Sequence, residues 1–269
     1  RDVVAALRRA MGLDAPLVVQ FWLWLTRTLR GDLGKSFISG YSVSELLWTT
    51  FLPTLELALA TLVMAVAIGG ALGLISATRK GAWRQAATAY SSLALTLPNF
   101  WTGVLAVLIF AVTLRWFPPS GRVSLLADPL GALTFLALPT LTLGFRLSGV
   151  ICRFTQGALL EVLREDYIRT ARAKGLSDRT TVRRHALPNA LVPLVTVLGI
   201  EFGRLLGGVV IVESIFSWPG IGRLIVQAIG NRDYAVIQGA LLFLTLCVIV
   251  VSLLVDVTYG LIDPRIRYS

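Results

Sequence analysis

Charged residues are unusually scarce in this chain. Asp, Glu, Lys and Arg together make up 15% of its 269 residues, whereas they make up about 25% of an average soluble domain. Hydrophobic residues account for 55% of the sequence, and its mean hydropathy is +0.75. A chain this apolar is neither intrinsically disordered nor suited to folding alone in water. The composition therefore indicates a membrane protein.

Residues that build metal and redox sites are also rare. The two cysteines, Cys152 and Cys247, lie far apart in the sequence, and neither belongs to a Cys-x-x-Cys pair. The single histidine, His185, excludes a zinc cluster built from several histidines of this chain. We therefore expect no metal site here.

Signatures of nucleotide binding and hydrolysis are missing from the sequence as well. No G-x-x-x-x-G-K-[ST] phosphate loop occurs, and neither does an H-E-x-x-H or G-x-S-x-G motif. We expect the chain to contain no catalytic residue and no cofactor of its own, and we do not expect it to be an enzyme.

Basic residues outnumber acidic ones. The 25 Lys and Arg against 15 Asp and Glu give a formal net charge of +10. Nucleic acid is one partner that such a charge suits, but in so apolar a chain the loop asymmetry of a membrane protein is the better explanation. We therefore expect lipid, and no nucleic acid, around this chain.

Long uncharged runs predict the membrane spans. Four runs (57–78, 85–114, 129–145 and 235–255) contain no Asp, Glu, Lys or Arg, and a fifth (189–212) is interrupted only by Glu201 and Arg204. A helix needs about 20 residues to cross the hydrocarbon layer. We predict an all-α polytopic membrane protein with five spans, at about 53–78, 88–114, 131–151, 190–213 and 235–260.

The distribution of basic residues predicts the orientation. The connection between the first two spans holds three Lys or Arg, the 152–188 connection holds eight, and the C-terminal tail holds two. The two remaining connections together hold four. Because cytoplasmic loops are enriched in Lys and Arg, we predict that the loop 152–189 and the C-terminus are cytoplasmic. The loop 213–234 then lies on the outer side.

This orientation also places residues 1–52 outside. The segment 17–30 (LVVQFWLWLTRTLR) is too short to span, so we predict a helix on the membrane surface. Because about 50 residues do not cross a membrane unaided, we expect a sixth helix or a signal ahead of Arg1 in the natural protein. The chain thus divides into a periplasmic segment, 1–52, and a transmembrane domain, 53–269.

The most informative stretch is residues 158–189. Apolar residues recur there at helical spacing, and Gly175 is placed to end that helix with a left-handed cap. Ser177 is placed to cap a second short helix, which we expect Pro188 to close. Such a two-helix unit favours docking of a cytoplasmic partner, while an ordinary basic loop is the simpler alternative.

This stretch resembles the EAA loop of binding-protein-dependent permeases of ATP-binding-cassette importers. Nine residues separate Gly175 from His185, Ala186, Leu187 and Pro188, as the Gly and Leu-Pro spacing of that motif requires. Arg169-Thr170-Ala171 stands where the motif has Glu-Ala-Ala, and His185 stands at its Ile position. Both departures resemble the peptide/nickel branch of the family.

Further motifs carry the same resemblance from about residue 12 to the C-terminus. They are RGDLGKSF (30–37), LPTLELAL (52–59), LPNFW (97–101), ESIFSWPGIGRL (213–224), NRDYAVIQ (231–238) and DPRIR (263–267). The resemblance implies a type I ABC-importer permease fold with six helices, in a bacterial cytoplasmic (inner) membrane.

The resemblance also implies partners and a mechanism. A binding protein would deliver substrate to two paired permeases, and we expect a heterodimer. Two ATPase subunits would bind ATP and Mg and drive transport. The implied substrate is a di- or oligopeptide, and nickel or a metal chelate is the alternative. A secondary transporter driven by an ion gradient is the competing class.

In the family, the EAA loop couples the permease to the ATPase. The residues to which the resemblance gives this role are Arg169, Thr170, Ala171, Arg172, Ala173, Lys174, Gly175, Leu176, Leu187 and Pro188.

Two charged residues mark a candidate translocation path. Glu201 and Arg204 lie three residues apart inside a predicted span, where charges are costly and face the bundle interior or water. Either they form a structural ion pair or they line the channel. Gly199, Gly203 and Gly207 form overlapping G-x-x-x-G repeats, so we expect this helix near the subunit interface and the pore.

The connection 213–234 is too apolar for a simple loop. We predict a short, partly re-entrant helix after Trp218-Pro219-Gly220. Phe216 and Trp218 would then either close the outer mouth of the path or anchor at the membrane interface. Arg232 and Asp233 are candidate contacts for the binding protein.

Overall fold

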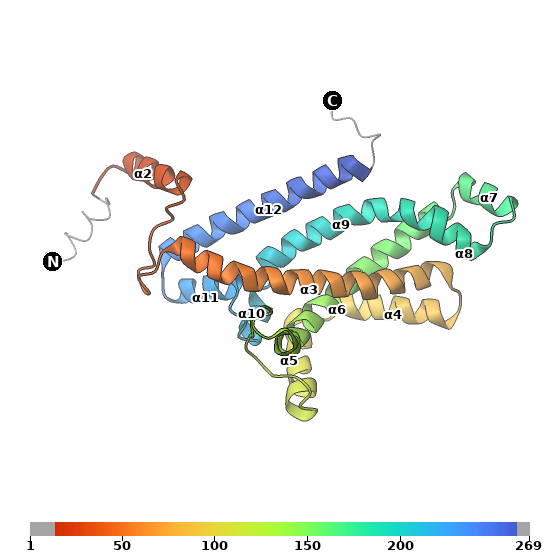
Figure 1. Cartoon of the computed structure of the whole chain (residues 1–269), viewed down its shortest axis with the longest axis horizontal. Coiled ribbons are helices and arrows are strands. Elements are labelled where there is room, and N and C mark those ends of the chain that lie inside the picture. Colours follow the sequence, from red (N-terminus) through yellow and green to blue (C-terminus); the bar gives the residue numbers. More distant parts are fainter. Residues whose placement is uncertain (1–13, 263–269) are drawn as a thin grey trace.

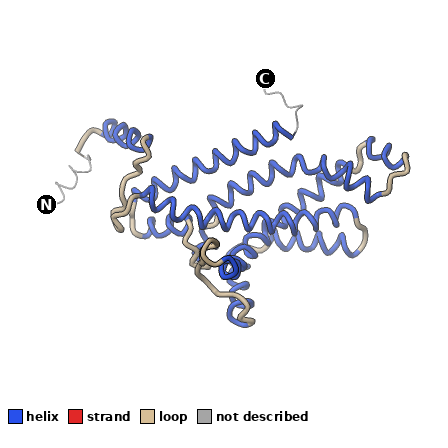
Figure 2. The backbone as a smooth tube through the Cα atoms, viewed as in Figure 1, coloured by secondary structure: helices blue, strands red, loops and turns tan. Residues whose placement is uncertain are grey.

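A computed structural model of the protein describes residues 14–262. The sixth N-terminal helix expected before Arg1 and the DPRIR motif at 263–267 lie outside the described residues. Regular structure in 14–262 consists of helices (Figures 1 and 2). They are α2 (Leu17–Leu29), α3 (Val43–Thr78), α4 (Ala82–Thr96), α5 (Asn99–Ala106), η1 (Val107–Thr113), α6 (Pro129–Val162), α7 (Asp166–Ala173), α8 (Asp178–Thr181), η2 (Val182–Ala186), α9 (Leu187–Gly208), α10 (Val210–Ile215), α11 (Ile221–Gly230) and α12 (Tyr234–Ile262).

Four helical runs are long and apolar enough to cross a membrane, or five if the bent α4–α5 pair counts as one span. The all-α class is therefore confirmed, and the number of spans agrees with the five that the sequence predicts. The bounds of several helices differ from the predicted ones, and each difference has a local cause.

The first long helix begins ten residues before the predicted start at Pro53. α3 runs for 36 residues from Val43 and contains Pro53 in its interior. Proline lacks the backbone N–H, but membrane helices tolerate it where neighbouring groups satisfy the freed backbone atoms. The carbonyl that Pro53 leaves without its helical donor is that of Thr49. The carbonyl of Pro53 itself accepts from Trp218 Nε1 at 2.9 Å, which ties α3 to the segment after α10.

The second predicted span, 88–114, is not one straight helix. α4 ends at Thr96, α5 begins at Asn99, and the two axes are bent by 103°. Pro98 causes the break, because the residue before a proline is pushed out of the helical conformation, and Leu97 is extended at ψ 129°. α4 packs along α6, whereas α5 and η1 run at a steep angle to α4, and α5 packs against α6 and α10 (Figure 1).

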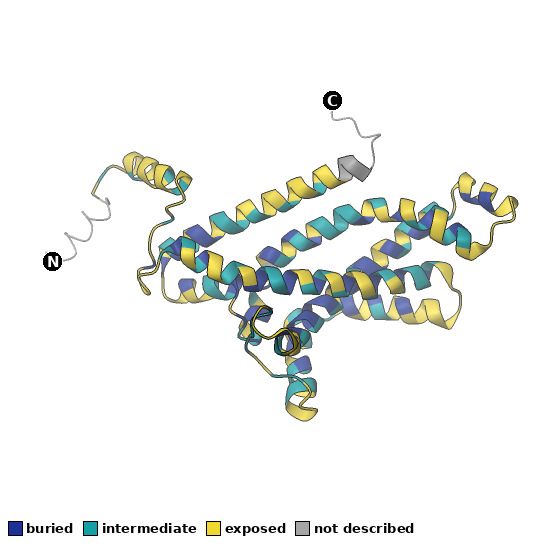
Figure 3. Ribbon diagram, in the orientation of Figure 1, coloured by how far each residue is buried: buried dark blue, intermediate teal, exposed yellow. Residues whose placement is uncertain are grey.

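The third helix extends well beyond the predicted 131–151. α6 runs from Pro129 to Val162, so it passes through eleven residues that we placed in the loop. Asp128 caps its start by accepting from the N–H of Gly131 at 3.0 Å. It is also the most buried of the long helices (Figure 3).

Close contact between α3 and α6 depends on two glycines. A Cβ at Gly69 would clash with the backbone of Ser148, and one at Gly73 would lie 2.8 Å from the carbonyl oxygen of Cys152. Small residues allow two helix backbones to approach this closely. α3 and α6 therefore form the tightly packed centre of the bundle.

Pro188 does not close a helix as predicted. Residues 178–207 form one continuous helical run, in which η2 is a π-helical turn and Pro188 lies in the first turn of α9. The run continues past Pro188 because the π-helical turn of η2 directly before it changes the hydrogen-bond pattern at the point where proline lacks its N–H. The fourth predicted span, 190–213, is instead divided into α9 and the short α10, which meet at Val209.

α2 lies apart from the bundle (Figure 1). It spans Leu17–Leu29, close to the predicted 17–30, and none of its residues is buried (Figure 3). Its exposed side chains include Phe21, Trp22 and Trp24. Its position on a membrane surface remains a prediction.

Candidate functional site

The turn between α7 and α8 has the caps that the sequence predicts. Gly175 adopts φ +82°. Its N–H donates to the carbonyl of Arg172 at 2.9 Å, and the N–H of Leu176 donates to that of Ala171 at 3.3 Å. This pair of bonds defines a Schellman C-cap. Ser177 Oγ accepts from the N–H of Thr180 at 3.3 Å and caps α8.

An apolar cluster lies beneath this turn. Leu159 of α6, Ile168 of α7 and Ala186 of η2 are 0% exposed, and Ala190 of α9 is 3% exposed. Ala171, which we expected to contact the ATPase, is also buried, at 8% exposure. Its methyl group faces its own chain because Ala171 follows the buried Ile168 by three residues and so lies on the same side of α7. We name residues 158–190 the corner.

The other predicted coupling residues lie on the surface of the corner. Leu187 is half-buried, and the remaining residues are exposed: Arg169, Thr170, Arg172, Ala173, Lys174, Gly175, Leu176 and Pro188. Arg172 pairs with Asp178 at 3.1 Å and Arg169 with Asp166 at 3.3 Å. Exposed pairs such as these contribute little stability. The surface of the corner is therefore available to a partner.

Glu201 and Arg204 form the ion pair that was one of the two alternatives, and their position along a channel remains a prediction. Arg204 Nη1 lies 2.7 Å from Glu201 Oε1, so the two form an ion pair. Both also line a cavity of about 170 Å³, together with Asn99 of α5, Leu143, Arg146 and Leu147 of α6, and Leu205 of α9. The Glu201 side chain is 10% exposed and that of Arg204 68%.

The three glycines of the α9 repeats have different surroundings. A Cβ at Gly199 would clash with Val255 of α12, and one at Gly203 would lie 3.9 Å from Val248 of the same helix. At Gly207 a Cβ would meet no atom within 4 Å. Gly199 and Gly203 thus face α12 within this chain, and the expected location of α9 near a subunit interface and the pore remains a prediction.

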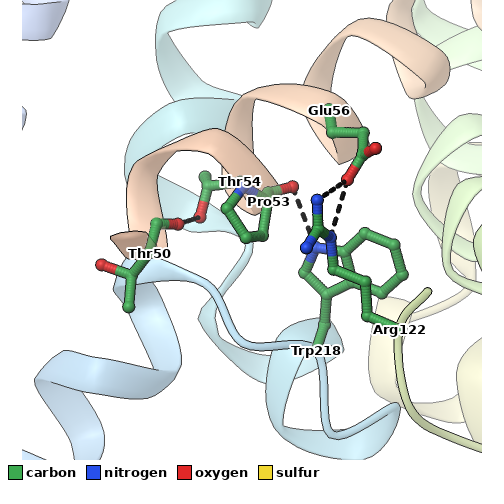
Figure 4. A network of polar contacts seen from close by, with 6 residues as sticks. All are labelled: Thr50, Pro53, Thr54, Glu56, Arg122 and Trp218. Carbon is green, nitrogen blue, oxygen red and sulfur yellow. Dashed lines mark hydrogen bonds and ion pairs between the residues drawn. The ribbon is translucent and has the colours of Figure 1, made fainter. Parts of the chain in front are cut away.

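Phe216 and Trp218 form part of the buried core. Each is 1% exposed. Trp218 Nε1 binds the carbonyl of Pro53, and the guanidinium of Arg122 lies 5.8 Å from the Trp218 ring (Figure 4). Arg122 is held there by Glu56, at 2.7 Å (Figure 4). Burial of both rings argues against anchoring at the membrane interface, and closure of an outer mouth by these residues remains a prediction.

The sequence reasoning missed Glu213, which is 0% exposed. Its carboxylate accepts from Thr54 Oγ1 of α3 at 2.7 Å and from the N–H of Arg223 at 2.9 Å. Arg223 lies in the first turn of α11, where a negative charge is favoured by the helix dipole. Glu213 therefore joins α3 and α11.

A signal for this site is present in the sequence. An acid interrupts an apolar run and is followed by Gly220 and Gly222. A Cβ at Gly220 would clash with the Glu213 carboxylate, and one at Gly222 would lie 3.0 Å from Glu213 Oε2. The glycines thus make room for the buried acid.

Asp233 is not a free contact for a binding protein. It is 3% exposed, and its carboxylate accepts from Ser36 Oγ at 2.5 Å and from the N–H of Phe37 at 3.4 Å. It therefore ties the start of α12 to the segment before α3. The neighbouring Arg232 is exposed, at φ +55°. We name residues 213–233 the latch.

Comparison with known proteins agrees with this geometry. The family described as "Binding-protein-dependent transport system inner membrane component" matches residues 69–268. The glutathione transport system permease protein GsiC of Salmonella choleraesuis is 43% identical over 100% of this chain and 85% of its own length. A probable peptide ABC transporter permease of Sinorhizobium fredii is 43% identical over 99% of this chain and 86% of its own.

Solved structures share the fold. The MetNI methionine ABC transporter in inward-facing conformations aligns with a TM-score of 0.66 at 22% identity, covering 81% of this chain and 96% of that chain. An amino acid ABC transporter with histidines aligns with a TM-score of 0.59 at 16% identity, covering 83% and 95%. At these identities the likeness concerns the fold alone. By its helices, its corner and its relatives, the chain belongs to the family of inner-membrane permease components of binding-protein-dependent ABC importers.

Proposed function

We propose that this chain carries short peptides across the cytoplasmic membrane after a binding protein delivers them. Relatives of this chain at 43% identity, matched over at least 99% of it, bear the names of glutathione and peptide permeases. Glutathione is itself a small peptide. The family match favours this class over an ion-driven secondary transporter.

The proposed coupling element is the exposed surface of the corner. Ala173 and Gly175 present little side-chain bulk beside Arg172 and Lys174, so a groove of an ATPase subunit can approach the backbone there, and Leu176 adds an exposed apolar side chain. The buried cluster under them joins α7 to both α6 and α9. Movement of the ATPase subunit would therefore be transmitted to α6 and α9 at the same time.

The orientation follows from charge. The corner and the C-terminus would be cytoplasmic, because Lys and Arg favour that side. The latch would then face the binding protein, and exposed Arg232 remains a candidate contact. A second permease, two ATPase subunits that bind ATP and Mg, and lipid against α2 complete the proposed assembly.

The proposed path passes the cavity that Glu201 and Arg204 line. Both residues lie in α9, one of the helices joined to the corner. Opening or closing of this cavity would accompany movement of the corner.

The decisive experiment reconstitutes the chain with its partner subunits in proteoliposomes. Uptake of trialanine, glutathione and nickel is measured together with ATPase activity. Peptide uptake is the expected result, and uptake of nickel alone would replace the proposed substrate. Gly175→Leu is expected to abolish uptake and substrate-stimulated ATPase activity, while binding-protein docking survives.

Gly31→Leu is the matched control for backbone strain. Gly31 adopts φ +83° and ends α2 with the same pair of hydrogen bonds, from its own N–H to Thr28 and from that of Asp32 to Arg27. As at Gly175, a Cβ there would meet no atom within 4 Å. Ala173→Trp adds bulk to the same surface without the strain of a positive φ. Normal stimulation of ATPase activity in both corner variants would contradict the proposed coupling.

A further inference from the structure

We infer that the cavity between α5, α6 and α9 recognises one charged end of the passing peptide, with Arg146 as the anchor for its carboxylate. The inference rests on the proposed function and adds to it a specificity-determining residue. The cavity is lined by two guanidinium groups, one carboxylate, one amide and three leucines.

Arg146 is the least expected member of this lining. It lies near the middle of the apolar helix α6, and its side chain is exposed. Within residues 14–262 no carboxylate lies within ion-pair distance of it. Charges within membrane helices face a water-filled cavity or a partner rather than lipid. The unpaired guanidinium is thus free to bind an anion from the cavity.

The two charges on α9 complement Arg146. Arg204 donates to Glu201 through Nη1 at 2.7 Å, which leaves further N–H groups of its guanidinium for a ligand. Glu201 is fixed by this bond and is almost fully buried. Its carboxylate is the group in the lining that can pair with an ammonium.

Asn99 adds an unsatisfied acceptor at the break between α4 and α5. Its Oδ1 atom is buried and has no hydrogen-bond partner among the described residues. Buried polar atoms normally have a partner, so a ligand N–H is a suitable one. Asn99 is also the first residue of α5, so the positive end of that helix dipole lies at the cavity and favours a carboxylate.

The size and charge of the cavity define the ligand class. Its volume of about 170 Å³ is well below the roughly 300–1,000 Å³ of pockets that enclose a drug-sized ligand. It therefore holds one end of a peptide rather than a whole one. Arg146 and Arg204 against Glu201 give the lining a net positive charge, which favours peptides with a free carboxylate over amidated or cationic ones.

The test is Arg146→Gln in the complete transporter in proteoliposomes, with saturating binding protein. The probes are radiolabelled trialanine and trialanine amide. Trialanine uptake is expected to fall about 10-fold, the loss expected for one hydrogen bond to a charged group, while uptake of the amide stays unchanged. If the binding protein prefers one of the two probes, the same binding protein still serves the wild type and the variant. Its preference therefore does not affect the ratio of variant to wild-type uptake for each probe.

Arg153→Gln is the matched control, since Arg153 is exposed on α6 two turns further along and lies outside the cavity. Arg146→Lys keeps the charge and is expected to restore part of the trialanine uptake. Unchanged trialanine uptake in Arg146→Gln, an equal loss for both probes, or no rescue by lysine would each overturn the inference. If the wild type transports neither trialanine nor glutathione, the proposed function fails, and the inference fails with it.

Discussion

The latch and the corner both connect short helices to the long ones, but they use different groups. In the latch, the carboxylates of Glu213 and Asp233 are buried and accept hydrogen bonds from α3 and from the segment before it. In the corner, the buried cluster is aliphatic, and the polar side chains other than Thr181 are half-buried or exposed. A buried acid holds its partners in fixed directions, whereas an apolar cluster tolerates sliding.

The difference suits the roles proposed for the two regions. The latch keeps one end of α3, α11 and α12 in a single arrangement. In the corner, the apolar cluster packs α7 against α6 and α9, while the exposed surface of the corner stays free for a partner. The following substitutions test this contrast, in order of decreasing effect.

Glu213→Leu is expected to have the largest effect. It leaves Thr54 Oγ1 and the N–H of Arg223 without their buried acceptor, which costs about 3–4 kcal/mol. The thermal midpoint of the detergent-solubilised chain should fall sharply. Glu161→Gln, at an exposed acid, is the control and should leave the midpoint unchanged. A stable Glu213→Leu protein would show that the latch does not depend on its acid.

Ile168→Ala tests the apolar seat of the corner. Ile168 is 0% exposed, and its truncation should cost about 2–3 kcal/mol through lost burial and a cavity. Because α7 lies at the end of the bundle, hydrogen exchange should rise in α7 while exchange in α3 stays slow. Equal acceleration in both helices would show that the corner is not a separate unit.

Asp233→Asn should have an intermediate effect. The amide can still accept from Ser36 Oγ, but the bond loses its charge, at a cost of about 1–2 kcal/mol. The expected readout is faster hydrogen exchange around residues 36–37 and at the start of α12. Arg232→Gln, at the exposed neighbour, serves as the comparison. Identical exchange in the two variants would contradict the assigned role of the carboxylate.

Ser177→Ala should have the smallest effect. It removes the side-chain cap of α8 and should cost about 1 kcal/mol. Loss of structure should be confined to the turn after Gly175, as seen by exchange of residues 178–181, with the thermal midpoint nearly unchanged. A drop as large as that of Glu213→Leu would remove the distinction between latch and corner.

The contrast also explains which features the sequence predicts. The caps at Gly175 and Ser177 depend on atoms a few residues apart, so residue type and spacing suffice to find them. The bonds of the latch join residues 159 and 197 positions apart. Such pairings form only in the folded chain. Local patterns therefore predicted Asp233 to be an exposed contact and did not identify Glu213 as a site residue.

The helix bounds likewise depend partly on local sequence and partly on contacts between distant residues. Runs of apolar residues located the long helices, but Pro53, Pro98 and Pro188 each required knowledge of their surroundings. Pro98 breaks a helix, whereas the other two lie within continuous ones, and for Pro53 the partner of its carbonyl comes from Trp218. Likewise, helical spacing placed Ala171 on α7, but only the packing of α6 and α9 shows that its methyl group faces inward.

The contact between α3 and α6 has a consequence for how this sequence can diverge. Every amino acid other than glycine carries a Cβ, and at Gly69 that atom would strike the backbone of Ser148, which no rotamer change can relieve. One residue further, Gly70 meets nothing within 4 Å. Two adjacent glycines in one helix thus differ completely in their freedom to mutate. Since α6 continues from this contact to the corner, an accepted change at Gly69 would need compensating changes along both helices.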